Sequence, residues 1–69
     1  MIDPWAKAAE CTRALALNFT LNPERKMVLL QLREFWITLA NERAMGKTGW
    51  ESLAESASGI HADAMASVH

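Results

Sequence analysis

Residues 45–48 read MGKT, which resembles the end of a phosphate-binding loop. Such a loop has the pattern G-x-x-x-x-G-K-[ST], and it lies between a strand and a helix so that its backbone amides approach the phosphates. Here Asn41 occupies the position of the first glycine, inside a segment with a helical pattern. We therefore interpret MGKT as a turn between helices, with Thr48 capping the next helix, and expect no nucleotide or other cofactor.

Cys11 is the single cysteine of the chain, so a disulfide within one chain is excluded. A nucleophilic or metal-binding thiolate needs a lowered thiol pKa, which nearby cations provide. The adjacent Glu10 would instead raise that pKa. Two interpretations of Cys11 remain open: a small buried apolar residue, or a reactive or intersubunit thiol.

The C-terminal region contains residue types that bind metals, namely His61, His69 and Asp63. Their spacing does not place them together on one turn of a helix. The same region also contains three serines, Ser52, Ser56 and Ser58. A hydrolase triad requires a rigid scaffold and oxyanion donors, and a fraying tail supplies neither. We predict solvated histidines here, no metal site and no enzymatic activity.

Length and composition restrict how this chain can be stabilised. Its 69 residues are 51% hydrophobic, with a formal net charge of −1. A chain this short buries only about 60% of its unfolded surface and usually needs a staple or a partner. The sequence has neither a disulfide nor the Cys/His spacing of a zinc site. Helix packing and oligomerisation are therefore the remaining sources of stability.

The charge pattern also restricts the partners. A net charge of −1 provides no strong field for nucleic acid or an anionic membrane. No apolar run reaches the roughly 20 residues that a membrane span needs. The N-terminal residues lack the pattern of a secretory signal, and the thiol is free. We expect a cytoplasmic protein without a membrane or nucleic-acid partner, and the sequence indicates no particular small-molecule ligand.

Two segments begin with the same helix-start signal. Asp3 precedes Pro4, and Asn22 precedes Pro23, which places a capping side chain before a proline at the first helical position. This predicts helices over about residues 4–18 and 23–45, packed antiparallel across a short turn. The expected apolar seam of the first helix consists of Trp5, Ala8, Ala9, Thr12, Leu15, Ala16 and Phe19.

The second predicted helix is apolar around much of its circumference. Its apolar arc covers roughly 220°, whereas a surface helix needs only about 100°. We therefore expect this helix to be central, with apolar surface left over for a second subunit. The predicted interface residues are Val28, Leu29, Leu32, Arg33, Phe35, Trp36 and Leu39.

Arg33 falls inside this apolar arc. Its aliphatic stem can cover apolar surface while the guanidinium reaches water. The alternative is an ion pair with Glu51 or Glu55 on the third helix, or with another subunit. Arg25 and Arg43 lie beside Trp36 on the projection and are candidates for a cation–π contact.

A third helix is predicted over about residues 49–58. Gly46 suits the end of the second helix, and Thr48 with Glu51 forms a capping-box pattern. Gly59 is unfavourable inside a helix, so residues 60–69 either continue the helix or fray.

Part of the chain, about residues 5–42, resembles a group of short alphaproteobacterial proteins with the pattern A-x-E-C … D-P-E-x-R … L … W … L-A. The matching positions are Ala8 to Cys11, Asn22 to Arg25, Leu29, Leu32, Trp36, Leu39 and Ala40. Asn22 replaces the more usual aspartate and keeps the capping function. The resemblance implies a helical hairpin and no assigned activity.

These patterns predict a single all-α domain. It consists of an antiparallel two-helix hairpin and a shorter C-terminal third helix, completed into a bundle by oligomerisation. We expect a homo-oligomeric protein–protein interaction module. The alternative is an adaptor or small regulator whose second helix is covered by another protein. A helix-turn-helix DNA-binding regulator is disfavoured because the third helix begins with acidic residues.

Overall fold

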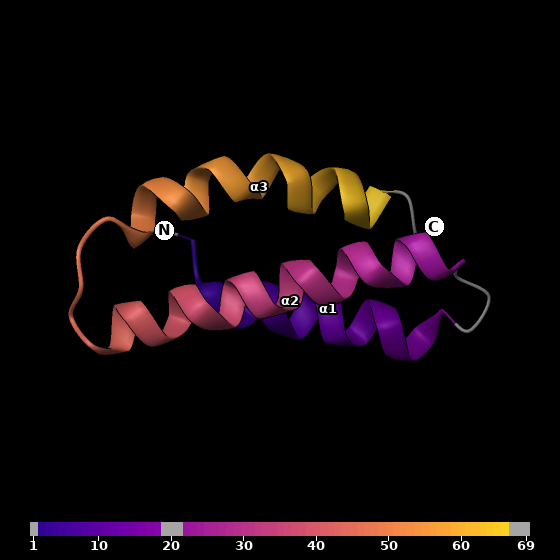
Figure 1. Ribbon diagram of the computed structural model, residues 1–69, viewed down its shortest axis with the longest axis horizontal. Helices are drawn as coiled ribbons and strands as arrows, with labels where there is room; N and C mark the ends of the chain where they lie inside the picture. The colour runs from indigo at the N-terminus through magenta and orange to yellow at the C-terminus, as the bar shows by residue number, and fades with distance from the viewer. Residues whose placement is uncertain (1, 19–21, 67–69) are drawn as a thin grey trace.

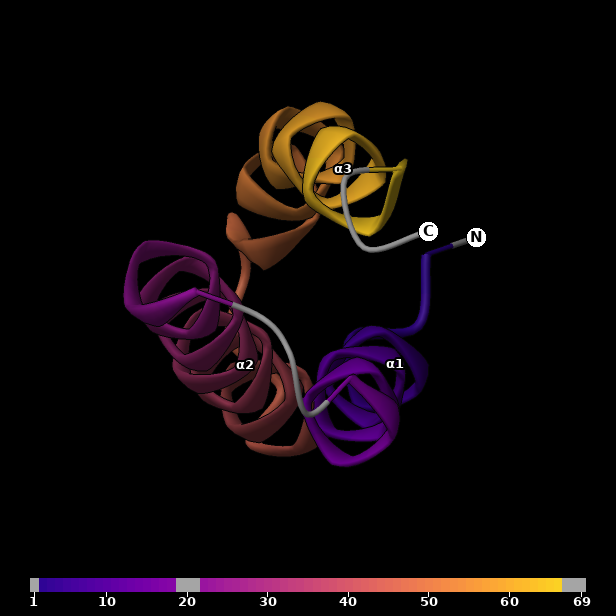
Figure 2. The same ribbon diagram turned by 90° about the vertical axis from the view of Figure 1, so that its right-hand side faces the viewer.

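The computed structural model describes residues 2–18 and 22–66, and it contains three α-helices. They are α1 (Pro4–Leu17), α2 (Pro23–Ala44) and α3 (Trp50–Ala66). No strand occurs among the described residues, which confirms the all-α prediction. In Figure 1, α1 and α2 run antiparallel side by side and α3 lies along them. Seen along the bundle, the three helices occupy the corners of a triangle (Figure 2).

Both predicted helix starts are confirmed. The Asp3 carboxylate accepts a hydrogen bond from the Trp5 backbone N–H at 3.0 Å. The Asn22 side-chain oxygen accepts one from the Arg25 backbone N–H at 2.8 Å. Each cap satisfies a backbone donor that has no partner within the first helical turn.

The end of α2 follows the prediction at Gly46, which has a φ of +75°. Its N–H bonds to the Arg43 carbonyl at 3.1 Å, and the Lys47 N–H bonds to the Glu42 carbonyl at 3.0 Å. This pair of bonds is the Schellman arrangement, which requires a left-handed residue at this position.

The predicted capping box after this turn is wrong. The third helix begins at Trp50, directly after Gly49 with a φ of +92°, and not next to Thr48. The Thr48 hydroxyl makes no hydrogen bond to any described residue. The left-handed backbone at Gly49 turns the chain between Thr48 and the helix, so α3 starts one residue too late for Thr48 to cap it.

The expectation of a shorter third helix is wrong, and of the two outcomes left open beyond Ser58 the structure shows the helix continuing. Helix α3 has 17 residues against 14 in α1, and it continues through Gly59 to Ala66. Buried residues recur along its whole length, at Trp50, Ala54, Ala57, His61 and Ala64. Packing of this stripe on the hairpin outweighs the roughly 1 kcal/mol cost of one internal glycine.

Gly59→Ala is expected to raise the free energy of unfolding by about 0.5–1 kcal/mol, because alanine loses less backbone entropy in a helix. A Cβ at Gly59 would meet no atom within 4 Å, whereas Gly46 has a positive φ that strains alanine. Urea denaturation followed by far-UV circular dichroism measures both variants. Gly46→Ala is the control and should destabilise. A Gly59→Ala variant that is less stable than wild type would contradict the helical conformation at this position.

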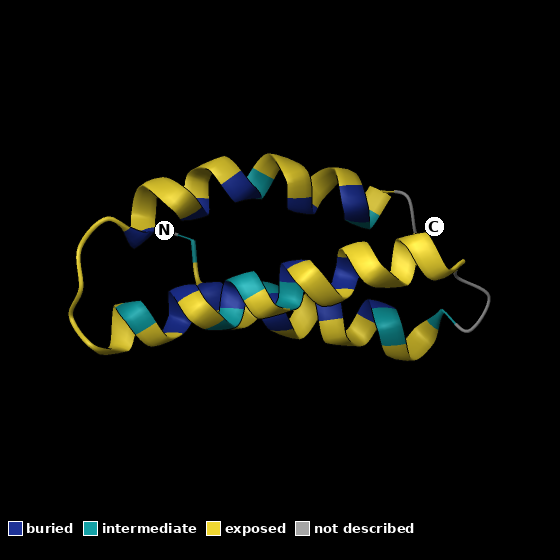
Figure 3. Cartoon of the chain, viewed as in Figure 1, coloured by how far each residue is buried: buried dark blue, intermediate teal, exposed yellow. Residues whose placement is uncertain are grey.

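The core lies on the inner faces of the three helices (Figure 3). Helices α1 and α2 pack closely along their length, whereas α3 contacts the hairpin more sparsely. The buried stripe of α1 begins at Pro4 and continues through Ala8 and Cys11, while Trp5 is 54% exposed. The predicted seam of α1 is confirmed at Ala8 and Leu15 but is wrong at Trp5, Ala9, Thr12 and Ala16, which are exposed. Small residues allow α1 and α2 to approach more closely than Trp5 would.

Some predicted positions lie outside the described residues. These are Phe19 in the predicted seam, the turn at Thr20 and Leu21, and His69. Within the described part of the chain, no helix combines the length and apolar character needed to cross a membrane.

Candidate functional site

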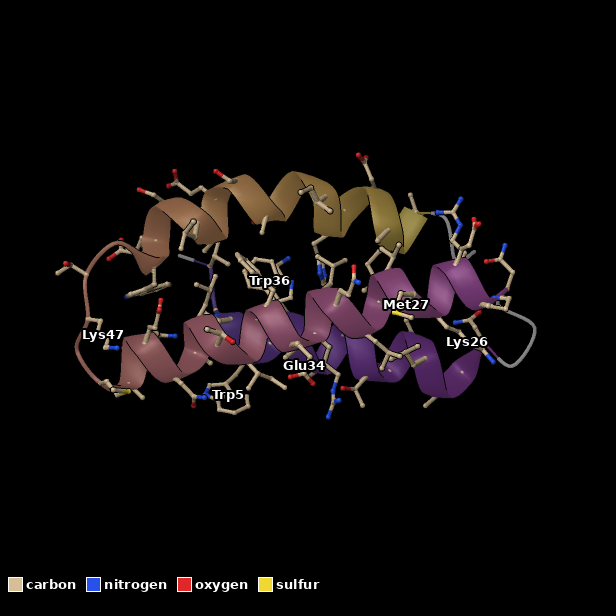
Figure 4. The ribbon with its side chains drawn as sticks, viewed as in Figure 1. Trp5, Lys26, Met27, Glu34, Trp36 and Lys47 are labelled. Carbon is tan, nitrogen blue, oxygen red and sulfur yellow. The ribbon has the colours of Figure 1, made fainter. Side chains whose placement is uncertain are left out.

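Each helix contributes one side chain to a buried cluster at the centre of the bundle. Trp36 of α2 donates a hydrogen bond from Nε1 to His61 Nδ1 of α3 at 3.0 Å. Cys11 Sγ of α1 lies 3.7 Å from the same His61 nitrogen. Trp36 points from α2 toward α3, whereas Trp5 points away on the other side of the hairpin (Figure 4). We name these three residues, Cys11, Trp36 and His61, the central cluster.

The hydrogen bond from Trp36 determines the protonation of His61. Because the indole Nε1–H only donates, His61 Nδ1 must accept and carries no proton. The proton of the neutral imidazole is then on Nε2. The two rings meet edge to face, with centroids 5.7 Å apart and an interplanar angle of 83°. His61 therefore acts as a hydrogen-bond acceptor toward α2 in its neutral form.

The other imidazole nitrogen is buried near a carboxylate. His61 Nε2 lies 3.4 Å from Glu10 Oε2, but it makes no well-formed hydrogen bond to a described residue. Burial lowers the pKa of His61, and the charge of Lys7 lowers it further, while Glu10 opposes both effects. The neutral imidazole is favoured because desolvation penalises a charge at this depth.

The Cys11 thiol is also held in its neutral form. Burial raises the pKa of Cys11, Glu10 raises it as well, and Arg33 and Lys7 act in the opposite direction. A nucleophilic Cys–His pair needs a thiolate that a substrate can reach. Cys11 is 0% exposed and His61 is 2% exposed, so this closed conformation presents neither group to a substrate. The cluster instead connects the three helices.

One of the two interpretations of Cys11 is confirmed, whereas the interpretation of His61 was wrong. Cys11 is buried, as one of its two interpretations predicted. His61 was expected to be a solvated tail residue. The signal that identifies it is the spacing of Trp50, Ala54, Ala57, His61 and Ala64, which alternates four and three residues and passes through Gly59.

An open groove of about 390 Å³ runs between α2 and α3. We name it the α2–α3 groove, and it is lined by Val28, Gln31, Leu32, Phe35, Ala57 and Ile60. Ile60 is 59% exposed and Val28 is 40% exposed. Gln31 is the one polar residue in this lining, so a partner could cover the groove without desolvating a charge.

The seven predicted interface residues divide into two groups. Four of them, Leu29, Leu32, Trp36 and Leu39, are buried in the core of the single chain. They pack against the other two helices, so in this fold they are not available to a second subunit. The other three, Val28, Arg33 and Phe35, retain exposed surface. The wide apolar arc of α2 is therefore satisfied partly within one chain.

Arg33 contacts α1 and not the predicted carboxylates of α3. Its Nε donates to Thr12 Oγ1 at 2.9 Å, and its Nη1 lies 3.9 Å from Glu34 on its own helix. The pairing with Glu51 or Glu55 was wrong because Arg33 projects toward α1, on the side of α2 away from α3.

The predicted cation–π contact also involves a different ring. The Arg43 guanidinium lies 5.6 Å from the centre of the Trp50 ring, not beside Trp36. Arg43 Nη1 additionally lies 3.5 Å from Asp3 Oδ1. Arg43 thus connects the start of α1 with the start of α3.

Neither a metal site nor a related protein assigns a function to this chain. Among residues 2–18 and 22–66, no group of three or more His, Cys, Asp or Glu side chains is placed to hold a metal ion. Comparisons with family models, curated proteins and solved structures find no match to this chain.

Proposed function

We propose that this small helical protein is a protein–protein interaction module that forms a homodimer through the α2–α3 groove. The observation that carries the proposal is the exposed apolar surface of this groove, where Ile60 and Val28 remain 59% and 40% exposed. Exposed apolar surface of this kind marks interaction sites on small soluble proteins.

The thin core supports a second copy as the occupant. Six of the buried core residues are alanines, namely Ala8, Ala14, Ala40, Ala54, Ala57 and Ala64. Alanine contributes little apolar area, and short chains commonly add stability by association. Covering the groove with another copy would bury large side chains that the single chain leaves in water.

The shape of the groove also suits a two-fold arrangement. Ile60 stands at the α3 edge, while Val28 and Phe35 form the α2 side. In a two-fold dimer the same patch meets itself, so the Ile60 of each copy would enter the other groove. Phe35 packs edge to face on Trp36 with ring centroids 5.8 Å apart, which gives this wall a rigid support.

Val28→Asp is expected to raise the dimer dissociation constant at least about tenfold, because a carboxylate would be buried without a partner. The matched control is Leu30→Asp. Leu30 is also on α2 and is 43% exposed, but it lies outside the groove lining. Sedimentation equilibrium on both variants and on wild type measures the association.

Two results would overturn this proposal. One is a wild-type protein that remains monomeric at about 100 μM, well above the micromolar range of ordinary association. The other is a Leu30→Asp variant that dissociates as much as Val28→Asp, which would place the interface elsewhere on α2. Circular dichroism of each variant confirms that helix content is unchanged.

A further inference from the structure

His61 is the one buried polar side chain in the described part of the chain. It sits on the helix that is least extensively packed, since α3 contacts the hairpin more sparsely than α1 contacts α2. The remaining buried residues of α3 are Trp50 and three alanines. Docking of α3 therefore depends strongly on the two aromatic rings, Trp50 and His61.

The contact between Trp36 and His61 is compatible with only one protonation state of the imidazole. At 3.0 Å, the Trp36 Nε1–H needs an acceptor, and neutral His61 Nδ1 provides it. A protonated imidazole carries a hydrogen on both nitrogens. Protonation would therefore place two N–H donors against each other in the core, at a position where the tryptophan side chain is 0% exposed.

The charged groups around His61 do little to offset this conflict. Those that face it both come from α1, namely Glu10 and Lys7. Glu10 Oε2 lies 3.4 Å from His61 Nε2, but the same oxygen lies 3.7 Å from Lys7 Nζ. From α2 the neighbour is the Trp36 indole, which is uncharged. The carboxylate is thus shared with a cation, and its side chain is 53% exposed to water.

We propose that His61 is an acid-sensitive latch, whose protonation in mildly acidic solution releases α3 from the α1–α2 hairpin and exposes the face of α2 around Trp36. The segment between Met45 and Trp50 would serve as the hinge. Gly46 and Gly49 adopt positive φ values there, and a Cβ at either would meet no atom within 4 Å, so the turn is not packed against the helices. The hairpin would be retained through the more extensive packing of α1 on α2.

The direction of the pH effect follows from the lowered pKa of His61 in the closed form. Once released, the imidazole returns to its ordinary pKa of about 6.5. Above that pH the residue is neutral in both forms, and the closed form keeps its full stability. As the pH falls below about 6.5 the open form binds the proton first, so the opening constant rises by up to about tenfold per pH unit. The rise ends where the pH reaches the pKa of the closed form.

The test is an NMR titration of the Trp36 indole N–H from pH 8 to pH 5, with far-UV circular dichroism in parallel. Trp36→Phe identifies the resonance by its disappearance. Wild type should show loss or a large shift of this resonance below about pH 6.5, while most helix content remains. Simultaneous loss of the indole signal and of helicity would be global unfolding and would overturn the latch.

Two glutamine variants assign the response to one histidine. His61→Gln can still accept the Trp36 hydrogen bond through its amide oxygen but cannot take up a proton. It should therefore keep the indole resonance to pH 5. The control is His69→Gln, which removes the other histidine of the chain and should titrate like wild type. Equal titration of His61→Gln and wild type, or loss of the response in His69→Gln, contradicts the proposal.

Glu10→Gln tests the latch independently, because it changes the surroundings of His61 without replacing the histidine. Glu10 raises the pKa of His61, so its removal should lower the closed-form pKa further. The rise in opening should then continue to lower pH than in wild type, with greater opening near and below the wild-type closed-form pKa. A weaker acid response in Glu10→Gln would overturn the latch. Repeating the titration in the Val28→Asp background separates the latch from dimer formation, since the indole response should persist in a monomer.

Discussion

Trp36→Ala is expected to lower the free energy of unfolding by about 3–5 kcal/mol, which is the usual cost of truncating a buried tryptophan. Trp36 is 0% exposed, its indole bonds to His61 at 3.0 Å, and its ring packs on Phe35. A domain of this size has roughly 3–10 kcal/mol of total stability, at about 0.05–0.15 kcal/mol per residue. The variant should thus be largely unfolded or close to it at 25 °C.

Urea denaturation followed by circular dichroism measures this effect, and Trp36→Phe separates its two causes. Phenylalanine keeps most of the buried ring but removes the Nε1–H, leaving the His61 nitrogen without its donor. The expected cost is about 1–3 kcal/mol. A Trp36→Ala variant that loses less than about 1 kcal/mol would contradict the central position of this ring.

Leu29→Ala is expected to lower the free energy of unfolding by about 2–5 kcal/mol, while Leu30→Ala should change it by no more than about 0.5 kcal/mol. The two residues are adjacent on α2, but Leu29 is 1% exposed and Leu30 is 43% exposed. Leu29 belongs to the hydrophobic core, and a cavity would remain in its place. Successive helical residues point about 100° apart, so one faces the core and the other faces water.

These two variants are a matched pair, because each replaces a leucine of α2 with alanine and only the burial of the leucine differs. Chemical denaturation of both variants at a concentration where wild type is monomeric isolates the fold from association. Equal losses at the two positions would contradict the orientation of α2. A larger loss of unfolding free energy for Leu30→Ala than for Leu29→Ala would mean that α2 buries the opposite face.

Local chemistry made the helix boundaries predictable. Asp3 and Asn22 cap α1 and α2 by bonding to amides two and three residues away, and Gly46 ends α2 by adopting a φ of +75°. Each of these interactions joins residues that are close in sequence, so the residue types alone indicate them. The capping box at Thr48 failed because a second left-handed glycine, Gly49, altered the same turn.

Helix rotation was not predictable in the same way. The apolar pattern of α1 favoured a seam through Trp5 and Thr12, whereas the bundle buries Pro4, Ala8 and Cys11. Alternative faces of an alanine-rich helix differ little in hydrophobicity. The choice depends on how closely α1 can approach α2, which is a property of the pair of helices.

The amino-acid pattern by itself determined that this chain forms three helices, where two of them begin, and where α2 ends, because hydrogen bonds between near neighbours encode those features. The bundle alone decided that α3 continues through Gly59, that Arg33 bonds to Thr12, and that Cys11, Trp36 and His61 meet. Cys11 and His61 are 50 residues apart in the chain. Only packing of three helices can bring such distant groups together, and their burial, with the charge of Lys7, favours the neutral imidazole.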